Sequence, residues 1–306
     1  MAITLPANVI ESVRRFRVSS SFGARGGIVT DLDGTALHER AGRLYVVDSV
    51  AEGLKALAEL GRPVVLNTLR FPLNVVRTFG REWSAITSQP VPLVSLNGAV
   101  VGLLIPQDGE WTGFRERAAF PLSQGDVEAM VSDIDDLISG GLSNVVVFIY
   151  PRDWHAGEIV WTPEPAHVDA LRAKYLSATE VVAGPIEMLR RTVVSHEVCM
   201  LSVQADIPED QRMAYQHVNP SQFLTARGVD KLSGAREAAA QFGFELQESV
   251  GAGDTPMDRF LEGVGLGFHV GPLQLSFRAH TETLRLDTPQ ELGHALFELA
   301  RLEPRA

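Results

Sequence analysis

Short apolar, β-branched runs alternate along this chain with segments whose apolar residues follow helical spacing. Ile28 to Thr30 is the first such run, and Pro63 to Leu66 is the second. Between them, residues 47–60 place apolar side chains on one helical face and end before Gly61, as helices often do. This order of strand, helix and strand predicts a crossover unit of a parallel sheet, whose ligands bind beyond the carboxyl ends of the strands.

The same alternation returns near the carboxyl terminus. A third apolar run, Val91 to Leu96, ends in Asn97 and Gly98, and the pattern resumes after about residue 222. It predicts helices at 235–241 and 289–302, strands ending near 250 and 270, and an amphipathic helix at 8–17. We therefore expect an α/β fold with a doubly wound parallel sheet, formed by residues 1–99 and 222–306.

Residues 100–221 show a different pattern, in which helical and strand-like segments interleave. The expected helices are 125–138, 166–175 and 208–217, and the expected strands are 145–150, 158–162 and 193–203. Such an order is typical of a separate α+β layer, so this region is predicted to be an inserted second domain.

The composition is that of a globular protein and narrows the classes of partner. The 306 residues are 45% hydrophobic and 21% charged, which is enough to bury the core of one large domain or two smaller ones. A formal net charge of −11 argues against a nucleic acid or an anionic membrane attracted by bulk charge. It leaves room for a small cationic pocket that binds a phosphate.

Cys199 is the one cysteine, so the sequence excludes an intramolecular disulfide and a multi-cysteine zinc site. Residues 1–18 lack the apolar core of a signal peptide, and no apolar run approaches membrane-spanning length. A cytoplasmic location is therefore expected.

Asp31 and Asp33 follow the first strand, and Gly34 and Thr35 interrupt its pattern. Side chains of an extended backbone alternate, so both carboxylates are predicted to project to the same side. Two surface charges in a turn would also explain the Asp-Gly dipeptide. The chemical alternative is that one carboxylate attacks while the other handles the proton, as in reactions through an aspartyl-phosphate. Because two anions repel a phosphate, such a site also needs a metal ion and a lysine.

The segment Asp31-Leu32-Asp33-Gly34-Thr35 resembles the first motif of the haloacid dehalogenase superfamily of phosphatases and phosphotransferases. Later motifs follow in the same order: Thr68 after an apolar run, Lys231 in Gly-Val-Asp-Lys, and the run from Gly253 to Asp258. Together the four motifs extend over nearly the whole chain. The resemblance implies a C2-type cap at residues 100–221, as in the Cof-type and sugar-phosphatase branches.

The resemblance also implies how the phosphoryl group is handled. Asp31 is expected to be the nucleophile, and Asp33 is expected to protonate the leaving group and then to activate water. Thr68 and Lys231 are expected to bind the phosphoryl oxygens. Asn97 resembles a position where the chain leaves the core for the cap, and it is a secondary candidate for substrate binding.

Mg²⁺ is the cofactor that the resemblance implies. Its expected ligands are the carboxylates of Asp31 and Asp254 and the backbone carbonyl of Asp33, since magnesium favours hard oxygen ligands. Asp258 is expected to support the site through water or by orienting Lys231.

Two positions depart from the pattern of many relatives. Leu69 stands where they have glycine, which bears on the local backbone shape, and Met257 stands where they have asparagine. Arg70 is expected either to face the substrate or to form a surface salt bridge.

The expected partner is a small phosphorylated metabolite, with sugar phosphates as the leading class. Polar residues of the cap that could select it, each of which could equally be solvated, are Arg152, Asp153, Trp154, His155, Arg190, Arg191, His196 and Glu197. Two other functions stay open: a phosphotransferase or phosphomutase of the same superfamily, and a non-catalytic protein that binds a phosphometabolite.

Overall fold

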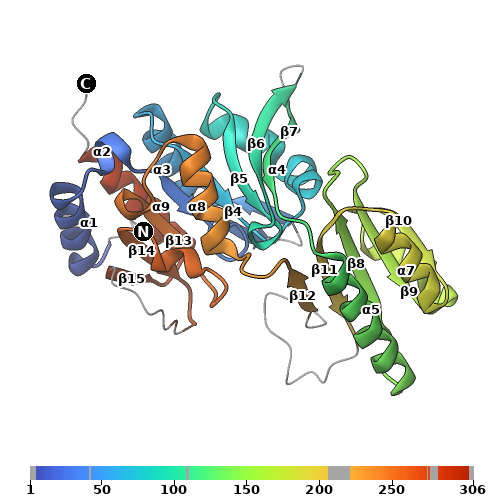
Figure 1. Cartoon of the computed structure of the whole chain (residues 1–306). Helices are drawn as coiled ribbons and strands as arrows, with labels where there is room; N and C mark the ends of the chain where they lie inside the picture. Colours follow the sequence, from blue (N-terminus) through green and yellow to red (C-terminus); the bar gives the residue numbers. More distant parts are fainter. Residues whose placement is uncertain are drawn as a thin grey trace. The chain divides into compact units, whose positions relative to one another are not determined.

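A computed structural model describes residues 5–40, 43–107, 110–205, 221–273, 275 and 282–302. The chain divides into two compact units (Figure 1). Unit 1 comprises Met1–Arg70, Val75–Ala118 and Asp230–Ala306, and unit 2 comprises Phe71–Asn74 and Ala119–Val229. Unit 1 contains a mainly parallel sheet and unit 2 a separate mixed sheet, so the predicted α/β core with an inserted α+β layer is confirmed.

Unit 1 is built on an eight-stranded sheet with the strand order β15-β14-β13-β1-β4-β5-β6-β7. The strands are β1 (Ile28–Thr30), β4 (Val64–Asn67), β5 (Val91–Ser95), β6 (Val100–Gln107), β7 (Glu110–Ala119), β13 (Val250–Gly253), β14 (Leu266–Val270) and β15 (Glu282–Leu286). β1 pairs in parallel with β13 on one side and with β4 on the other. The strand order therefore reverses at β1, which is where open sheets of this kind bind their ligands.

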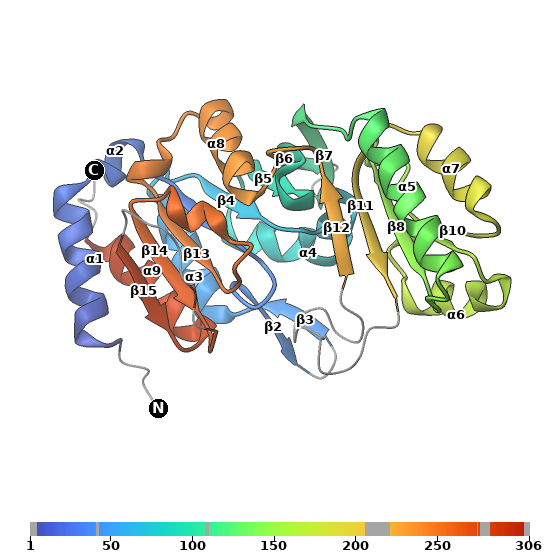
Figure 2. The ribbon, with the colours of Figure 1, turned by 60° about the horizontal axis from the view of Figure 1, so that its bottom comes forward.

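Helices cover both faces of this sheet. They are α1 (Ala7–Ser19), α2 (Phe22–Arg25), α3 (Asp48–Glu59), α4 (Pro72–Ile86), α8 (Lys231–Phe242) and α9 (Pro289–Arg301), with short 3-10 helices η1 (Leu96–Gly98), η5 (Leu246–Glu248) and η6 (Arg259–Glu262). Leu232 and Ala235 of α8 pack on one face against Val29 and Val65. Figure 2 shows α3 and α9 on the opposite face.

A glycine contact sets the close packing of α3 against α9. A Cβ atom on Gly293 would lie 2.3 Å from the carbonyl carbon of Ser49, a distance that no real side chain tolerates. The absence of a side chain therefore lets the two backbones approach each other. A small antiparallel hairpin, β2 (Leu37–Arg40) and β3 (Arg43–Val46), connects β1 to α3.

Unit 2 is a five-stranded sheet in the order β10-β9-β8-β11-β12. Its elements are α5 (Gln124–Ser139), β8 (Val146–Pro151), β9 (Glu158–Thr162), η2 (Pro165–His167), α6 (Val168–Lys174), β10 (Ala178–Ala183), α7 (Ile186–Val194), β11 (Val198–Gln204) and β12 (Ser221–Thr225). Val131 of α5 and Leu189 of α7 pack on one face of the sheet with Trp161. On the other face, Leu171 of α6 packs against Phe148 and Val160.

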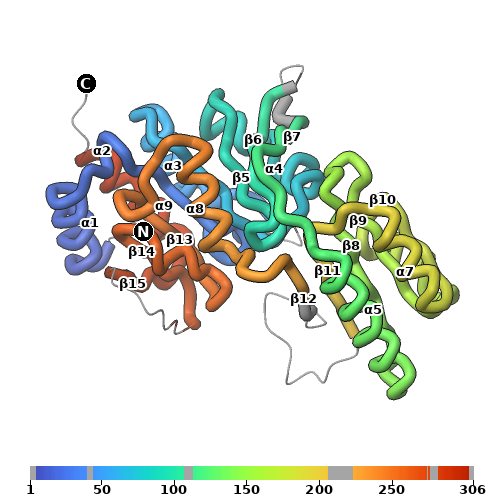
Figure 3. Tube along the Cα trace, in the orientation of Figure 1, coloured from blue at the N-terminus to red at the C-terminus, as the bar shows by residue number. Residues whose placement is uncertain are grey.

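Two segments differ from the sequence predictions. The strand expected at 193–203 begins only at Val198, because Val193 and Val194 end α7, and His196 and Glu197 lie in the connection. The chain does not leave the core at Asn97: it turns through η1 and returns antiparallel to β5 as β6 (Figure 3). Residues 100–118 consequently belong to unit 1. The helix expected at 208–217 lies outside the described residues.

Candidate active site

Asp31 and Lys231 meet at the carboxyl-terminal edge of the sheet of unit 1. Asp31 follows β1 directly, and its backbone N–H donates to the carbonyl of Ala252 in β13 at 2.9 Å. Lys231 is the first residue of α8, whose N-cap Asp230 forms a capping box with Ser233. The Lys231 Nζ donates to Oδ1 of Asp31 at 2.5 Å, and both side chains are almost wholly buried.

Asp258 ties this lysine to the loop that follows β13. Its Oδ1 accepts a hydrogen bond from Lys231 Nζ at 2.6 Å. Its Oδ2 accepts from the backbone N–H groups of Asp254 and Thr255, each at 2.9 Å. Both oxygens therefore accept from donors of the chain, and the support of the site that was predicted for Asp258, through water or by orienting Lys231, stays a prediction.

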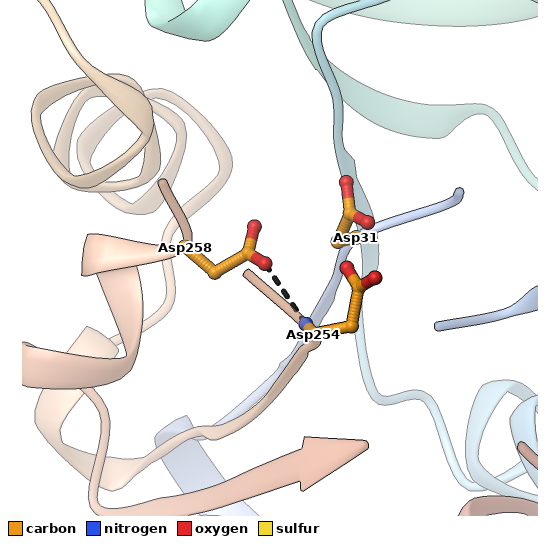
Figure 4. A group of neighbouring side chains, drawn as sticks. All are labelled: Asp31, Asp254 and Asp258. Atoms are coloured by element: carbon orange, nitrogen blue, oxygen red, sulfur yellow. Dashed lines mark hydrogen bonds between the residues drawn. The ribbon is translucent and has the colours of Figure 1, made fainter. Parts of the chain in front are cut away.

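Asp254 completes a group of three carboxylates. Figure 4 shows Asp31, Asp254 and Asp258 directed toward one another, and one oxygen of each lies within 4.8 Å of the others. Thr35 donates its hydroxyl between two of them, at 3.5 Å to Asp31 and 3.3 Å to Asp254. Gly34, with a φ of +81°, makes room for this arrangement, because a Cβ there would lie 2.1 Å from Oδ2 of Asp254.

The group holds more carboxylates than cations. When all four side chains are ionised, three carboxylates face one ammonium, which is an excess of two negative charges. Burial raises the pKa of Asp31 well above its ordinary value, Lys231 opposes the rise, and Asp258 and Asp254 add to it. Burial, and then the charge of Asp258, raise the pKa of Asp254 to about 7. Burial alone would lower the pKa of Lys231, but Asp258 and Asp31 outweigh it, so its pKa is raised and it stays charged.

Asp33 has a different partner from Asp31. β1 ends at Thr30, so both aspartates lie in the turn that follows the strand, and the prediction that their carboxylates project to the same side stays a prediction. Arg70 binds Asp33 through two parallel hydrogen bonds, from Nε to Oδ2 at 2.8 Å and from Nη2 to Oδ1 at 2.6 Å. Of the two alternatives for Arg70 the structure has the salt bridge, formed by an arginine whose side chain is only 18% exposed.

Thr68 and Asn97 lie at the same edge of the sheet. The Thr68 N–H donates to the carbonyl of Val94, and the Asn97 N–H donates to the carbonyl of Thr68 at 3.3 Å. The Thr68 hydroxyl accepts from the N–H of Arg70 at 3.1 Å, so its own hydrogen stays available for another acceptor. Among the described residues Leu69 is not one of the non-glycine positions with positive φ, so this turn does not require glycine there.

Three polar residues of this region were not predicted. Thr35 lies within the first motif, and Asn67 precedes Thr68 directly, with its amide donating to the backbone carbonyl of Lys231 at 2.9 Å. His269 in β14 is paired in register with Gly253, which places it beside Asp258. Asn67 and His269 occupy positions of buried strands where sequence patterns predict only apolar packing.

Several of the polar residues of unit 2 that were considered for substrate selection have local partners. Arg152 pairs with Glu197 at 3.3 Å, and Arg190 pairs with Glu128 at 3.2 Å. The rings of His155 and Trp154 are tilted by 34°, with centroids 3.9 Å apart. These contacts are of the kind found on solvated surfaces, so the selection of substrate by these residues stays a prediction.

Solved structures with the same arrangement of elements identify the fold. A sugar phosphatase of subclass IIB of the HAD superfamily matches 88% of this chain over 96% of its own length, with 18% identity and a TM-score of 0.60. A HAD-superfamily phosphatase from Bacteroides thetaiotaomicron matches 91% of this chain and 96% of its own length, at 17% identity and a TM-score of 0.62. A haloacid dehalogenase-like hydrolase from B. subtilis matches 89% and 98%, at 17% identity and a TM-score of 0.63.

The chain has the C2-capped haloacid dehalogenase fold. No family model and no curated protein match its sequence. At 17–18% identity the haloacid dehalogenase likeness establishes the fold and not the chemistry, which has to be argued from the residues of this chain. Within the part that the structure describes, no helix is both long enough and apolar enough to cross a membrane.

Proposed function

We propose that this protein is a magnesium-dependent phosphatase that hydrolyses a small phosphorylated metabolite through an aspartyl-phosphate. One observation carries the proposal: at the switch point of the sheet, a buried carboxylate, Asp31, is held at 2.5 Å by the ammonium of Lys231 within a group of three carboxylates. An aspartate so placed has the cation that a phosphoryl group requires beside it.

The residues of the site fit Mg²⁺. The two negative charges that the ionised group has in excess match a divalent cation, and the donors are carboxylate oxygens, which are hard ligands. Asp31 and Asp254 would hold the ion with the backbone carbonyl of Asp33, while both oxygens of Asp258 are engaged by donors of the chain. When bound, magnesium supplies charge neutralisation between the carboxylates and the phosphate.

In the proposed first step, a carboxylate oxygen of Asp31 attacks the phosphorus atom and the bond between phosphorus and the leaving oxygen breaks. Asp33 gives a proton to that oxygen, so the product leaves as an alcohol and Asp31 carries the phosphoryl group. Lys231 and the free hydroxyl hydrogen of Thr68 bind the phosphoryl oxygens as charge moves onto them.

In the second step, the Asp33 carboxylate takes a proton from a water molecule. The water oxygen attacks phosphorus, the bond to the Asp31 carboxylate breaks, and inorganic phosphate is released with Asp31 restored. Sugar phosphates are the leading substrate class, since a sugar phosphatase of subclass IIB is among the similar structures.

The test is phosphate release from a panel of sugar phosphates and other phosphometabolites, with Mg²⁺ or with a chelator, for the wild type and Asp31→Asn. We expect release that requires the metal and that the variant abolishes. Asp287→Asn is the control, because that aspartate is exposed and remote from the site, and it should leave the rates unchanged. Transfer to a sugar acceptor without net phosphate release would instead indicate a phosphotransferase. Binding without either reaction would indicate a non-catalytic protein.

A further inference from the structure

Arg70 stands out because its side chain is held on two sides. Its guanidinium forms the bidentate pair with Asp33, and its Cζ lies 5.1 Å from the centroid of the Phe79 ring. Phe79 is 1% exposed and belongs to α4, so the ring is a rigid support. A guanidinium over an aromatic face with a carboxylate in its plane is fixed in orientation, which a flexible lysine would not be.

The backbone of Arg70 is fixed as well. Its N–H donates to the hydroxyl of Thr68 at 3.1 Å, and its carbonyl accepts from the hydroxyl of Ser95 at 2.5 Å and from the N–H of Leu96 at 3.4 Å. These bonds connect the turn after β4 with the end of β5. Arg70 therefore links Thr68, which lies at the phosphate position of the proposed site, to Asp33, which lies at the leaving-group position.

The carboxylate of Asp33 needs such a support more than the other acidic groups of the site. Its side chain is 39% exposed, whereas those of Asp31 and Asp258 are almost wholly buried and bonded to Lys231. An exposed aspartate samples several rotamers. Two parallel N–H···O bonds select one of them and fix the plane of the carboxylate, while its remaining lone pairs stay free for a proton carrier or a water molecule.

We propose that Arg70 is a positioning residue for proton transfer to the leaving group. Its guanidinium, supported by Phe79, holds the Asp33 carboxylate in the one orientation that allows this transfer. This inference rests on the proposed phosphatase function and adds to it a residue that acts through Asp33. It assigns to Arg70 no contact with the phosphate.

The role predicts a dependence on the leaving group. An alkoxide leaves from phosphorus only with a proton, whereas p-nitrophenolate leaves as a stable anion and needs little help. Loss of Arg70 therefore lowers kcat/KM for an alkyl phosphate far more than for p-nitrophenyl phosphate. An arginine that bound the phosphate would affect both substrates equally, because the phosphoryl group is the same.

The kinetic experiment compares the wild type, Arg70→Met, Arg70→Lys and Asp33→Asn on p-nitrophenyl phosphate and on the alkyl phosphate that the wild type hydrolyses fastest. We expect Arg70→Met to lose at least about tenfold more kcat/KM on the alkyl phosphate than on p-nitrophenyl phosphate. Arg70→Lys keeps the positive charge without the bidentate guanidinium, so its loss of kcat/KM on the alkyl phosphate should lie between those of the wild type and Arg70→Met. In the Asp33→Asn background, Arg70→Met causes no further loss.

Equal losses on the two substrates, a rise of KM alone, or full additivity with Asp33→Asn would overturn the proposal. Arg25→Met is the matched control, because Arg25 also pairs with a carboxylate, Glu245, at 2.6 Å but lies away from the site. It should leave both rates at the wild-type level.

A second measurement does not depend on turnover. Crystal structures of the wild type and Arg70→Met in the same crystal form should show one Asp33 side-chain conformer in the wild type and several in the variant. A single unchanged conformer in the variant would refute the positioning role, whether or not the wild type releases phosphate. Absence of phosphate release from every substrate would refute the proposed function, and the two failures can therefore be told apart.

Discussion

Glu158 offers a quantitative test of how a buried charge affects the stability of unit 2. It begins β9, is 5% exposed, and accepts a hydrogen bond from the hydroxyl of Ser177 at 3.1 Å. The face of the sheet on which it lies is apolar, with Val160 and Phe148 packed beside Leu171. Burial raises the pKa of Glu158 from 4.5 to about 7, and the Ser177 hydrogen bond offsets only part of the rise. Glu158 plays no part in the proposed chemistry.

The sign of the effect follows from the direction of the shift. The folded state holds the proton of Glu158 more tightly than the unfolded state, so the folded protein loses stability as the pH rises from 4.5 to about 7. Above pH 7 the whole penalty is present, and below 4.5 it vanishes. At about 1.4 kcal/mol for each pH unit between the two values, the total is about 3 kcal/mol.

Glu158→Gln removes the charge and keeps an acceptor for Ser177. We expect the variant to gain about 2–3 kcal/mol in free energy of unfolding relative to the wild type between pH 5 and pH 8. The measurement is amide hydrogen exchange of residues 146–162, corrected at each pH for the chemical exchange rate, because it reports the opening of unit 2 itself. Glu180→Gln is the matched control, since it makes the same substitution at an exposed position of the neighbouring strand β10.

A difference between wild type and Glu158→Gln that is the same at both pH values would refute this reasoning. So would a variant that is less stable than the wild type by an amount that grows as the pH rises. Either result would mean that the carboxylate finds compensation in the folded state beyond the single bond from Ser177.

Three further predictions concern the site in unit 1. Gly34→Ala should raise the Mg²⁺ concentration for half-maximal phosphate release at least about tenfold, because a Cβ would lie 2.1 Å from Asp254; an unchanged titration would contradict this. Mg²⁺ at about 100 times its dissociation constant should add about 2.7 kcal/mol to the free energy of unfolding, which calorimetry would detect as a higher Tm. Asp254→Asn should lose this increase in Tm, while its Tm in the presence of chelator should equal that of the wild type. Asn67→Ala removes the side-chain bond that ties the first turn of α8 to β4, while the carbonyl of Lys231 keeps its helical partner, so it should cost about 0.5–1.5 kcal/mol in urea unfolding and lower kcat. A variant with wild-type stability and turnover would show that the bond is dispensable.

Periodicity predicted much of the core correctly because each element there buries one face. The runs 47–60 and 63–66 correspond to α3 and β4, and the tail helix corresponds to α9. The apolar pattern gave a wrong boundary where one segment contains the end of a helix and the start of a strand. Residues 193–203 begin and end with apolar residues, but the first two end a helix and the strand begins at Val198. Residues 100–118 carry no signal that distinguishes two further strands of the core sheet, β6 and β7, from the first strands of an inserted layer.

For the site, the local motifs indicated which residues are candidates, but they did not indicate which side chains contact one another in the folded chain. The residues Asp31, Lys231 and Asp254 were selected as candidates from local patterns and from the resemblance. The contact of Arg70 with Asp33 was open, since an arginine after a turn can reach substrate or a carboxylate. Asn67 was missed because a buried asparagine in a strand has no periodic signal.

The sequence by itself determined the order of strands and helices and the types of residue at the strand ends, because both depend on side chains close together in the chain. The tertiary structure alone decided which of those residues meet. Lys231 lies 200 positions from Asp31, and Thr35 lies 219 positions from Asp254. Only the parallel register of β13, β1 and β4 brings their ends to one edge, where burial raises the pKa values of Asp31 and Asp254 and a cation would favour their ionised forms.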